Sequence, residues 1–258
     1  MGIDVGPDRR VSYSPAHHNR VVSDPARNPV VQMVGDLPVV GIFRRTKTGD
    51  REHDGNPLIY ALKGKLGYRL TYSAARRLLA DARQIIPQIA AVGSCDVIVP
   101  MPSSSNVARY VARDLGRAYA LVPEERFRKA TVGEALARML PPEHIAPALR
   151  RAYTAQLRTM QRLPTGSLVQ MKEVRESAIR PLVPAVAADG LTDLAGKRIM
   201  LVDDLLSTGS TLRSAKALLE AAGVAGVFGV CLLSSTAAVR TDVAAALTGH
   251  VTHPIVGE

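Results

Sequence analysis

The chain has 258 residues, 47% hydrophobic and 4% aromatic with no tryptophan, which suffices for one large domain or a domain with an appendage. Its formal net charge is +10. No window approaches the roughly 18 uninterrupted apolar residues of a membrane span, and the N-terminus lacks the apolar core of a signal peptide, so the sequence favours a cytoplasmic protein without a membrane partner.

The positive charge is unevenly distributed. Residues 1–190 hold 28 Lys and Arg against 17 Asp and Glu, whereas residues 191–258 hold 5 against 6. Such a surface attracts polyanionic substrates or nucleic acid, but it is also typical of an ordinary solvated face. The sequence lacks the aromatic residues interleaved with basic ones that typify single-strand binding, so a nucleic-acid partner stays an open alternative.

The first part of the chain shows little regular patterning. Residues 1–35 are rich in Pro, Arg, Asn, Asp and His, and we expect a flexible, loosely attached arm there. Residues 36–72 begin with an apolar run at 37–45 that predicts a buried strand. A polar, turn-rich connection separates this strand from a short apolar piece that carries Lys63 and Lys65.

Strand and helix patterns then follow in turn from residue 73 to 240. A helical pattern starts at Ser73, a buried strand lies at 96–100, and a Pro- and Ser-rich loop leads into a helix that stops at Gly116. Hydroxyl and backbone N–H groups at the start of that helix can hold a phosphate, although Ser and Asn also cap helices that bind nothing. The candidate ligand-binding residues of this loop are Met101, Pro102, Ser103, Ser104 and Ser105.

Residues 123–190 are long, helical and basic for a connection between strands, and they predict a helical insert. Residues 143–163 place apolar side chains at helical spacing, with arginines on the opposite face. Such a helix packs on its own domain or on the partner in a homodimer, and the sequence leaves both open.

Residues 198–211 are the most informative stretch. An apolar run ends in Asp203 and Asp204, and a loop of small hydroxyl residues with one glycine follows. A helical pattern then runs to Gly223, and a second buried strand lies at 227–233. The segment therefore predicts one strand-loop-helix-strand unit of a parallel sheet, in an α/β protein.

The chemistry of this unit follows from its order. The loop lies at the carboxyl end of a strand and the amino end of a helix, where unpaired N–H groups and the helix dipole favour a phosphate. Two carboxylates beside that pocket accept hydrogen bonds from a vicinal diol, so a ribose 5-phosphate fits. No lysine follows the glycine, which excludes the common nucleotide-binding loop. The candidate phosphate ligands are Ser207, Thr208, Gly209, Ser210 and Thr211.

The run resembles the signature of type I phosphoribosyltransferases, in which an apolar strand, two acids and two small or apolar residues precede Thr/Ser-Thr-Gly-x-Thr. The resemblance implies a parallel-sheet, Rossmann-like core with a small N-terminal hood, phosphoribosyl pyrophosphate as donor, and Mg²⁺. By position, Asp203 and Asp204 would hold the ribose hydroxyls and the metal, and the earlier Ser-rich loop would hold pyrophosphate. The insert would supply the catalytic cations, for which we choose Lys129, Lys172 and Arg175.

The order of the lysine segment, the Val-Pro-Met-Pro loop and the Asp-Asp loop resembles the ComF-like, amidophosphoribosyltransferase-related branch. Two features of ComF-like proteins are missing, namely the Arg-Gly-Phe-Asn-Gln stretch and a four-cysteine zinc module. The two cysteines, Cys95 and Cys231, are expected to be buried and reduced.

These observations predict a phosphoribosyltransferase-like core at residues 73–240 and a C-terminal tail at 241–258. They also predict an enzyme that transfers ribose 5-phosphate to a nitrogen acceptor, either a nucleobase or an amine, and releases pyrophosphate. The alternatives are a non-catalytic regulator that binds the same donor, or a ComF-like DNA-handling protein. The sequence does not name the acceptor.

Overall fold

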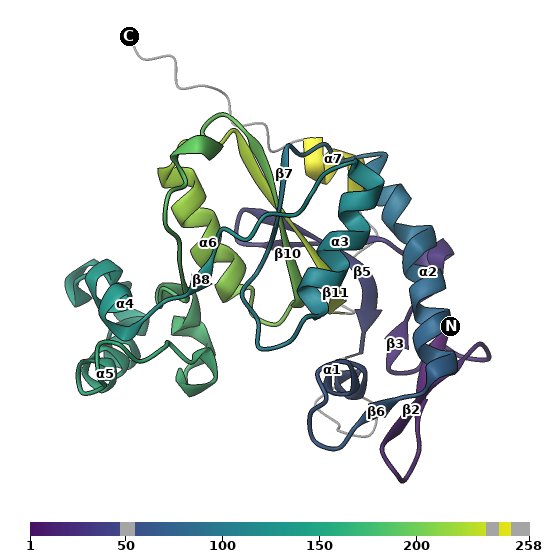
Figure 1. The fold of residues 1–258 in the computed structure, drawn as a ribbon. Helices are drawn as coiled ribbons and strands as arrows, with labels where there is room; N and C mark the ends of the chain where they lie inside the picture. The colour runs from purple at the N-terminus through teal and green to yellow at the C-terminus, as the bar shows by residue number, and fades with distance from the viewer. Residues whose placement is uncertain (47–54, 236–242, 249–258) are drawn as a thin grey trace.

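The computed structural model describes residues 1–46, 55–235 and 243–248, and its centre is a six-stranded sheet (Figure 1). The strand order is β3-β5-β11-β10-β7, and β4 also pairs with β5, along the edge that faces away from β11. The sheet strands are β3 (Val21–Val22), β4 (Val30–Val34), β5 (Leu37–Arg45), β7 (Val97–Pro100), β10 (Arg198–Leu205) and β11 (Gly226–Ser235). Because β5, β11, β10 and β7 are mutually parallel, the predicted α/β fold with a parallel sheet is confirmed.

Helices cover both faces of this sheet, which explains why its strands are continuous apolar runs. Helices α2 (Tyr72–Ala90) and α3 (Val107–Tyr119) share one apolar core with Ile98, Met200 and Val202. Helix α6 (Ser210–Ala221) packs on the opposite face against Val99 and Leu201. Figure 1 shows α3 and α2 on one side of the strands and α6 on the other.

The N-terminal residues are folded, which corrects the flexible arm expected for residues 1–35. Strand β1 (Gly2–Val5) pairs with β2 (Arg10–Ser14), and β2 pairs with β6 (Arg69–Leu70) in a separate sheet, while β3 and β4 join the main one. Ile3 and Val11 are fully buried. The expectation failed because these apolar residues stand singly among polar ones and find their partners far away in the chain. A 3-10 turn η1 (Pro25–Arg27) and helix α1 (Asn56–Leu62) complete this region.

The insert forms a small unit with its own apolar core. It contains helix α4 (Val132–Arg138) and helix α5 (Pro147–Gln161), which is the amphipathic helix predicted at 143–163. Tyr153 and Met160 of α5 are buried in the insert's core, and both helices lie to one side of the sheet in Figure 1. The other elements are β8 (Arg128–Lys129), β9 (Val186–Ala187) and the 3-10 turns η2 (Pro142–His144), η3 (Met171–Glu173) and η4 (Ser177–Leu182).

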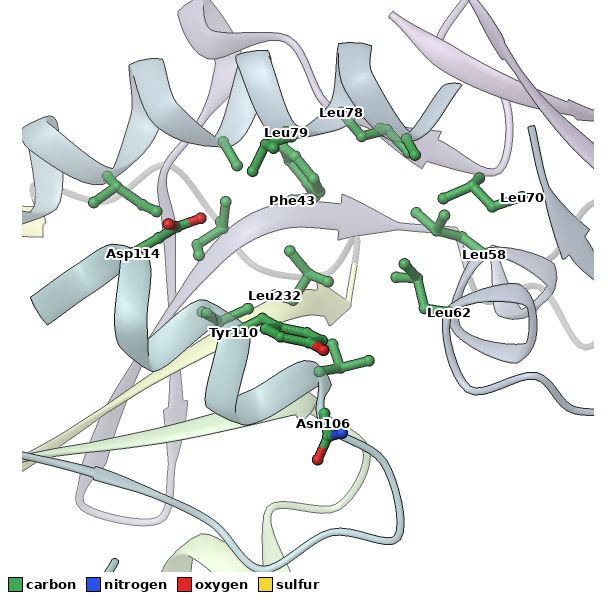
Figure 2. A pocket seen from close by; sticks show the side chains of 16 residues that line it. Phe43, Leu58, Leu62, Leu70, Leu78, Leu79, Asn106, Tyr110, Asp114 and Leu232 are labelled. Atoms are coloured by element: carbon green, nitrogen blue, oxygen red, sulfur yellow. The ribbon is translucent and has the colours of Figure 1, made fainter. Parts of the chain in front are cut away.

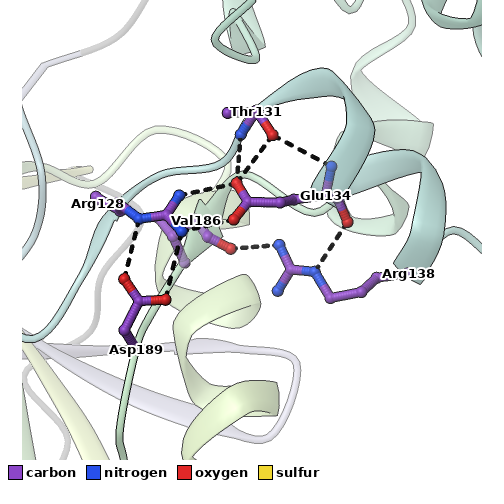
Figure 3. Close-up of polar contacts among 6 residues, drawn as sticks. All are labelled: Arg128, Thr131, Glu134, Arg138, Val186 and Asp189. Atoms are coloured by element: carbon purple, nitrogen blue, oxygen red, sulfur yellow. Dashed lines mark hydrogen bonds and ion pairs between the residues drawn. The ribbon is translucent and has the colours of Figure 1, made fainter. Parts of the chain in front are cut away.

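A polar network closes the insert where the chain enters and leaves it (Figure 3). The Arg128 guanidinium donates to both Glu134 oxygens at 2.8 and 2.6 Å and also contacts Asp189 at 3.3 Å. Glu134 accepts from the backbone N–H of Thr131 at 2.8 Å in a capping box at the start of α4. Arg128 lowers the pKa of Glu134 to about 2, so this carboxylate stays charged at physiological pH.

The C-terminal end and the cysteines complete the fold. Within the predicted tail, α7 (Val243–Thr248) packs its Leu247 into the main core; residues 249–258 lie outside the described part. A 3-10 turn η5 (Thr192–Leu194) precedes β10. Cys231 is buried and Cys95 half-buried, both are free thiols, and burial raises their pKa values. Among the described helices, none is long and apolar enough to cross a membrane.

Because the insert has its own core, Tyr153→Ala should open the insert and leave the sheet intact. Removing a fully buried aromatic ring costs about 3–5 kcal/mol. We expect hydrogen exchange to accelerate in α5 and not in β10. Tyr72→Ala, at a side chain that is 78% exposed, is the control and should change neither region. Equal loss of protection in α5 and β10 would show that the two cores unfold together.

Candidate functional site

The two acids are the sixth and seventh residues of β10 and belong to the strand itself. Side chains alternate along a strand, so adjacent residues face opposite sides of the sheet. Asp204 continues the face of Met200 and Val202, toward α2 and α3, whereas Asp203 continues the face of Leu201, toward α6. The pair therefore presents one carboxylate to each side of the strand end.

Asp204 is buried and already has partners. Its carboxylate accepts from Lys63 Nζ at 2.8 and 2.7 Å and from the Ser103 hydroxyl at 3.0 Å. Only 4% of the residue is exposed, whereas the predicted role as an acceptor for ribose hydroxyls requires an accessible carboxylate. The carboxylate is covered because the C-terminal end of α1 and the loop after β7 both close over it, and neither lies near it in sequence.

Asp203 is the more accessible acid, being partly exposed. Its Oδ1 accepts the backbone N–H of Asp204 at 2.8 Å. Burial, and after it the Asp204 carboxylate, raise the pKa of Asp203 to about 7. A carboxyl group with a raised pKa at the end of a strand is typical of a site that receives a cation or a hydrogen-bond donor from a ligand.

Two loops flank the acids at the carboxyl ends of neighbouring parallel strands. The loop after β7 leads into α3 and the loop after β10 leads into α6, and these helices cover opposite faces of the sheet. Ligands of open α/β sheets bind in the crevice that such diverging connections create. The Met101 N–H donates to the Val202 carbonyl at 2.8 Å, which holds the first loop beside the second strand.

The loop before α6 has the backbone geometry of an anion site. Gly209 is the N-cap, with φ of 68°, and a Cβ there would lie 2.3 Å from Val34 Cγ1. The Thr208 and Ser210 hydroxyls are 2.7 Å apart. Within the described residues no side chain caps α6, so the N–H groups of its first turn are available to a phosphate.

The predicted phosphate ligands differ in access. In the second loop Ser207 is exposed, Thr208 and Thr211 are half-buried, and Ser210 is buried. In the first loop Ser104 is exposed, while Pro102, Ser103 and Ser105 are half-buried. Met101 is 2% exposed and packs in the core, so its side chain is structural. Ser103 Oγ accepts the Ser105 N–H at 3.3 Å, which folds this loop back on itself.

The three cations predicted in the insert do not join the acids. Lys129 lies in β8, Lys172 in η3 and Arg175 just after η3, and none of their described contacts reaches Asp203 or Asp204. Arg175 instead lines a hollow against α5. Instead, Lys63, one of the two lysines in the short apolar piece, contacts Asp204.

The carboxylates do not form a metal cage by themselves. No group of three or more His, Cys, Asp or Glu in the described parts of the chain is arranged to hold a metal. Mg²⁺ needs no such cage, because it binds through one or two carboxylates together with water and ligand phosphates. Asp203 is the carboxylate whose position and partial exposure fit that role.

Residues 70–248, well over half of the chain, match the family described as the phosphoribosyl transferase domain. The chain belongs to this family. The transferase domain thus includes both loops and the acids, while Lys63 and the N-terminal sheet strands precede it.

Two solved structures are similar to the chain. One is described as the allosteric regulatory enzyme of purine biosynthesis, with 20% sequence identity and a TM-score of 0.31. The match covers 58% of this chain and 25% of that enzyme. The other is TT1426 from Thermus thermophilus, with 17% identity and a TM-score of 0.28 over 66% of this chain and 97% of that one. The comparison with curated proteins gave no match.

Gly209→Ala should be more damaging than Gly223→Ala. Both glycines have positive φ, 68° and 77°, but a Cβ at 223 has open space whereas one at 209 meets Val34. The backbone strain of about 1–2 kcal/mol is common to both variants. Overpacking should add about 1–3 kcal/mol at 209 alone. Urea unfolding measures the difference, and equal stability of the two variants would contradict the close packing at Gly209.

Asp203→Asn should stabilise the protein only at higher pH. The raised pKa means that the folded chain holds a proton which the unfolded chain loses near pH 3.8, so stability falls as pH rises from there to about 7. An asparagine at position 203 does not titrate, so the variant keeps its free energy of unfolding over this pH range. We expect melting temperatures that coincide near pH 4, while above pH 7.5 the variant should melt at least about 2–4 °C higher, because solvent screening of this partly exposed group leaves only part of the roughly 4 kcal/mol that the full pKa change would supply. With Asp4→Asn as control, parallel curves for Asp203→Asn and wild type would refute the raised pKa.

Proposed function

We propose that the protein is a phosphoribosyltransferase that takes ribose 5-phosphate from phosphoribosyl pyrophosphate and transfers it to a nitrogen acceptor. The supporting observation is the convergence of two loops and one carboxylate pair at the ends of β7 and β10. The loop before α6 suits the 5′-phosphate, and the loop before α3 suits the pyrophosphate. Asp203, at the end of β10, would accept a ribose hydroxyl.

In the proposed reaction the bond from the anomeric carbon to the pyrophosphate oxygen breaks, and the pyrophosphate leaves with the electron pair. The acceptor nitrogen forms the new bond to that carbon and loses its proton to water or to the leaving group. The ribose passes through an oxocarbenium-like state, as in other displacements at an anomeric carbon. A carboxylate near the ring stabilises that positive charge, and donors aimed at the leaving oxygens stabilise the negative one.

We assign Lys63 as a further cation for the pyrophosphate, in addition to those that the sequence predicts in the insert. Its Nζ lies 2.7 Å from Asp204, beside Ser103 of the proposed pyrophosphate loop. An ammonium held by a buried carboxylate has a fixed position, which favours charge stabilisation without reorganisation. Lys129, Lys172 and Arg175 stay a prediction for cations that approach the pyrophosphate from the insert.

We include Mg²⁺ in the proposal, held by Asp203 and by the donor's own oxygens. When bound it would neutralise charge on the pyrophosphate and so make it a better leaving group. The assignment to the ComF-like, amidophosphoribosyltransferase-related branch likewise stays a proposal, supported by the order of the lysine segment and the two loops.

A second candidate is a regulator in which the same donor controls binding to nucleic acid. The observation that favours it is a set of arginine–tyrosine pairs on α2 and α3. The guanidinium of Arg76 lies 5.8 Å from the ring of Tyr72, and that of Arg113 lies 5.8 Å from the ring of Tyr110. Tyr72 and Tyr110 are 78% and 58% exposed, so basic and aromatic groups interleave in space although they do not in sequence.

Asp203→Asn should lower kcat/KM at least about 100-fold, the size expected when one preorganised electrostatic contact is lost. The assay is pyrophosphate release with phosphoribosyl pyrophosphate, Mg²⁺ and a panel of purines, pyrimidines and amines. Chelation of the metal should also stop release. Asp4→Asn, an exposed acid remote from the sheet ends, is the matched control.

Two outcomes would count against the enzyme. Tight donor binding with no pyrophosphate from any acceptor would favour the regulator, and salt-dependent binding of single-stranded DNA by the same sample would support that role. Wild-type turnover in the Asp203→Asn, Asp204→Asn double variant would instead show that the site assignment is wrong.

A further inference from the structure

A large apolar pocket opens between α1, α2 and α3 over the sheet (Figure 2). Its volume is about 390 Å³, within the range of small-molecule sites. Phe43 of β5 and Leu232 of β11 form its floor, and Leu78 and Tyr110 stand on its walls. The remaining lining residues are Ile42, Leu58, Leu62, Leu70, Ala75, Leu79, Ala82, Ile86, Asn106, Val107, Val111 and Asp114.

One end of this pocket converges on Asp204. The β10–β11 register pairs Asp203 with Cys231 and Leu205 with Leu233, so Leu232 of the floor lies opposite Asp204. Paired strands are about 4.8 Å apart, and paired residues point to the same face. The pocket lining does not include Asp204 itself, but through Leu232 it comes within one strand spacing of the acid.

Both partners of Asp204 also adjoin the pocket along the chain. Leu62, which lines it, precedes Lys63, whose ammonium binds the carboxylate. Asn106, which also lines it, ends the loop in which Ser103 donates to the same carboxylate. Three separate segments therefore connect the apolar space to the proposed transfer site.

The lining offers very few hydrogen bonds. Thirteen of its sixteen residues are aliphatic or phenylalanine, and the polar exceptions are Asn106, Tyr110 and Asp114. Asn106 accepts from Arg109 at 3.4 Å, and Asp114 forms an ion pair with Arg117 at 2.5 Å. A nucleobase with polar groups on every edge would leave several of them unpaired here, which costs binding energy. An alkyl or aryl group gives up no hydrogen bonds to water on entering the pocket, and burial of its apolar surface favours binding.

We propose that this pocket receives the acceptor of the transfer reaction, and that the acceptor is an amine or ring nitrogen attached to an apolar alkyl or aryl body. The nucleophilic nitrogen would lie at the Asp204 end and the apolar body would extend between α2 and α3. The inference rests on the proposed phosphoribosyl transfer and names the substrate class of that same site.

The test uses 1-naphthylamine, a fluorescent apolar amine, on the full chain, which contains no tryptophan to interfere. Ala75→Leu places a larger side chain in the pocket, and Ala80→Leu makes the same change on an exposed, non-lining position of α2. We expect Ala75→Leu to weaken naphthylamine binding at least tenfold and Ala80→Leu to leave it unchanged. Binding of radiolabelled phosphoribosyl pyrophosphate should be equal in both variants.

Turnover completes the test. With 1-naphthylamine and a series of 4-alkylanilines as acceptors, pyrophosphate release should rise with chain length in the wild type. Ala75→Leu should raise the acceptor KM at least tenfold. If naphthylamine fails to bind, or binds Ala75→Leu as well as wild type, the pocket assignment is overturned. If the donor binds and polar nucleobases alone are glycosylated, the transferase proposal holds and the apolar acceptor is rejected. If the donor does not bind, the proposed function itself fails.

Discussion

The contact between Lys63 and Asp204 is the interaction on which the site depends. It joins α1, at the edge of the N-terminal region, to the end of a central strand, and Ser103 brings the loop after β7 to the same carboxylate. A buried carboxylate without partners is costly, and removal of one partner from a buried ion pair costs several kcal/mol. The buried Asp204 carboxylate therefore holds the three segments in one arrangement, because separating them would leave its negative charge without a partner.

The parallel sheet supplies the frame for this contact. Helix α3, which follows β7, and helix α6, which follows β10, cover opposite faces of the sheet. Because the two helices diverge, a crevice opens where they begin. The insert lies outside this frame. It has a separate apolar core and a neck closed by Arg128, Glu134 and Asp189.

The two acids of the site differ in their hydrogen-bond partners and in their exposure. Asp204 serves structure, because its oxygens are taken by Lys63 and Ser103, while Asp203 keeps partial exposure and a raised pKa. In the proposed reaction, the apolar pocket would extend the same asymmetry to recognition of the acceptor. Charged groups gather at the carboxyl edge of the sheet, and the space beside them between α2 and α3 is almost wholly apolar. This arrangement is the basis of the proposal that a phosphorylated donor and an apolar acceptor meet there.

The local features of the site could be predicted from the sequence. The strand, the acids and the glycine loop at residues 198–211 are contiguous, and a phosphate cradle is made from backbone N–H groups whose position depends on neighbouring residues alone. The helix around Tyr153 could be predicted for the same reason, because its periodicity is local. The same holds for the apolar runs of β5 and β7, which need no distant residue to be recognised as buried strands.

The tertiary structure decided what depends on distant residues. Lys63 and Asp204 are 141 positions apart, and no pattern near either one indicates the other. For the same reason the folding of residues 1–35, the burial of Asp204, the core position of Met101 and the distance of the insert's cations from the acids could not be seen in the sequence. The sequence alone predicted a strand-loop-helix unit whose loop suits a phosphate and whose acids suit a diol. Burial and side-chain pairing across the fold decided which acid is available, which cation accompanies it and what space lies beside them.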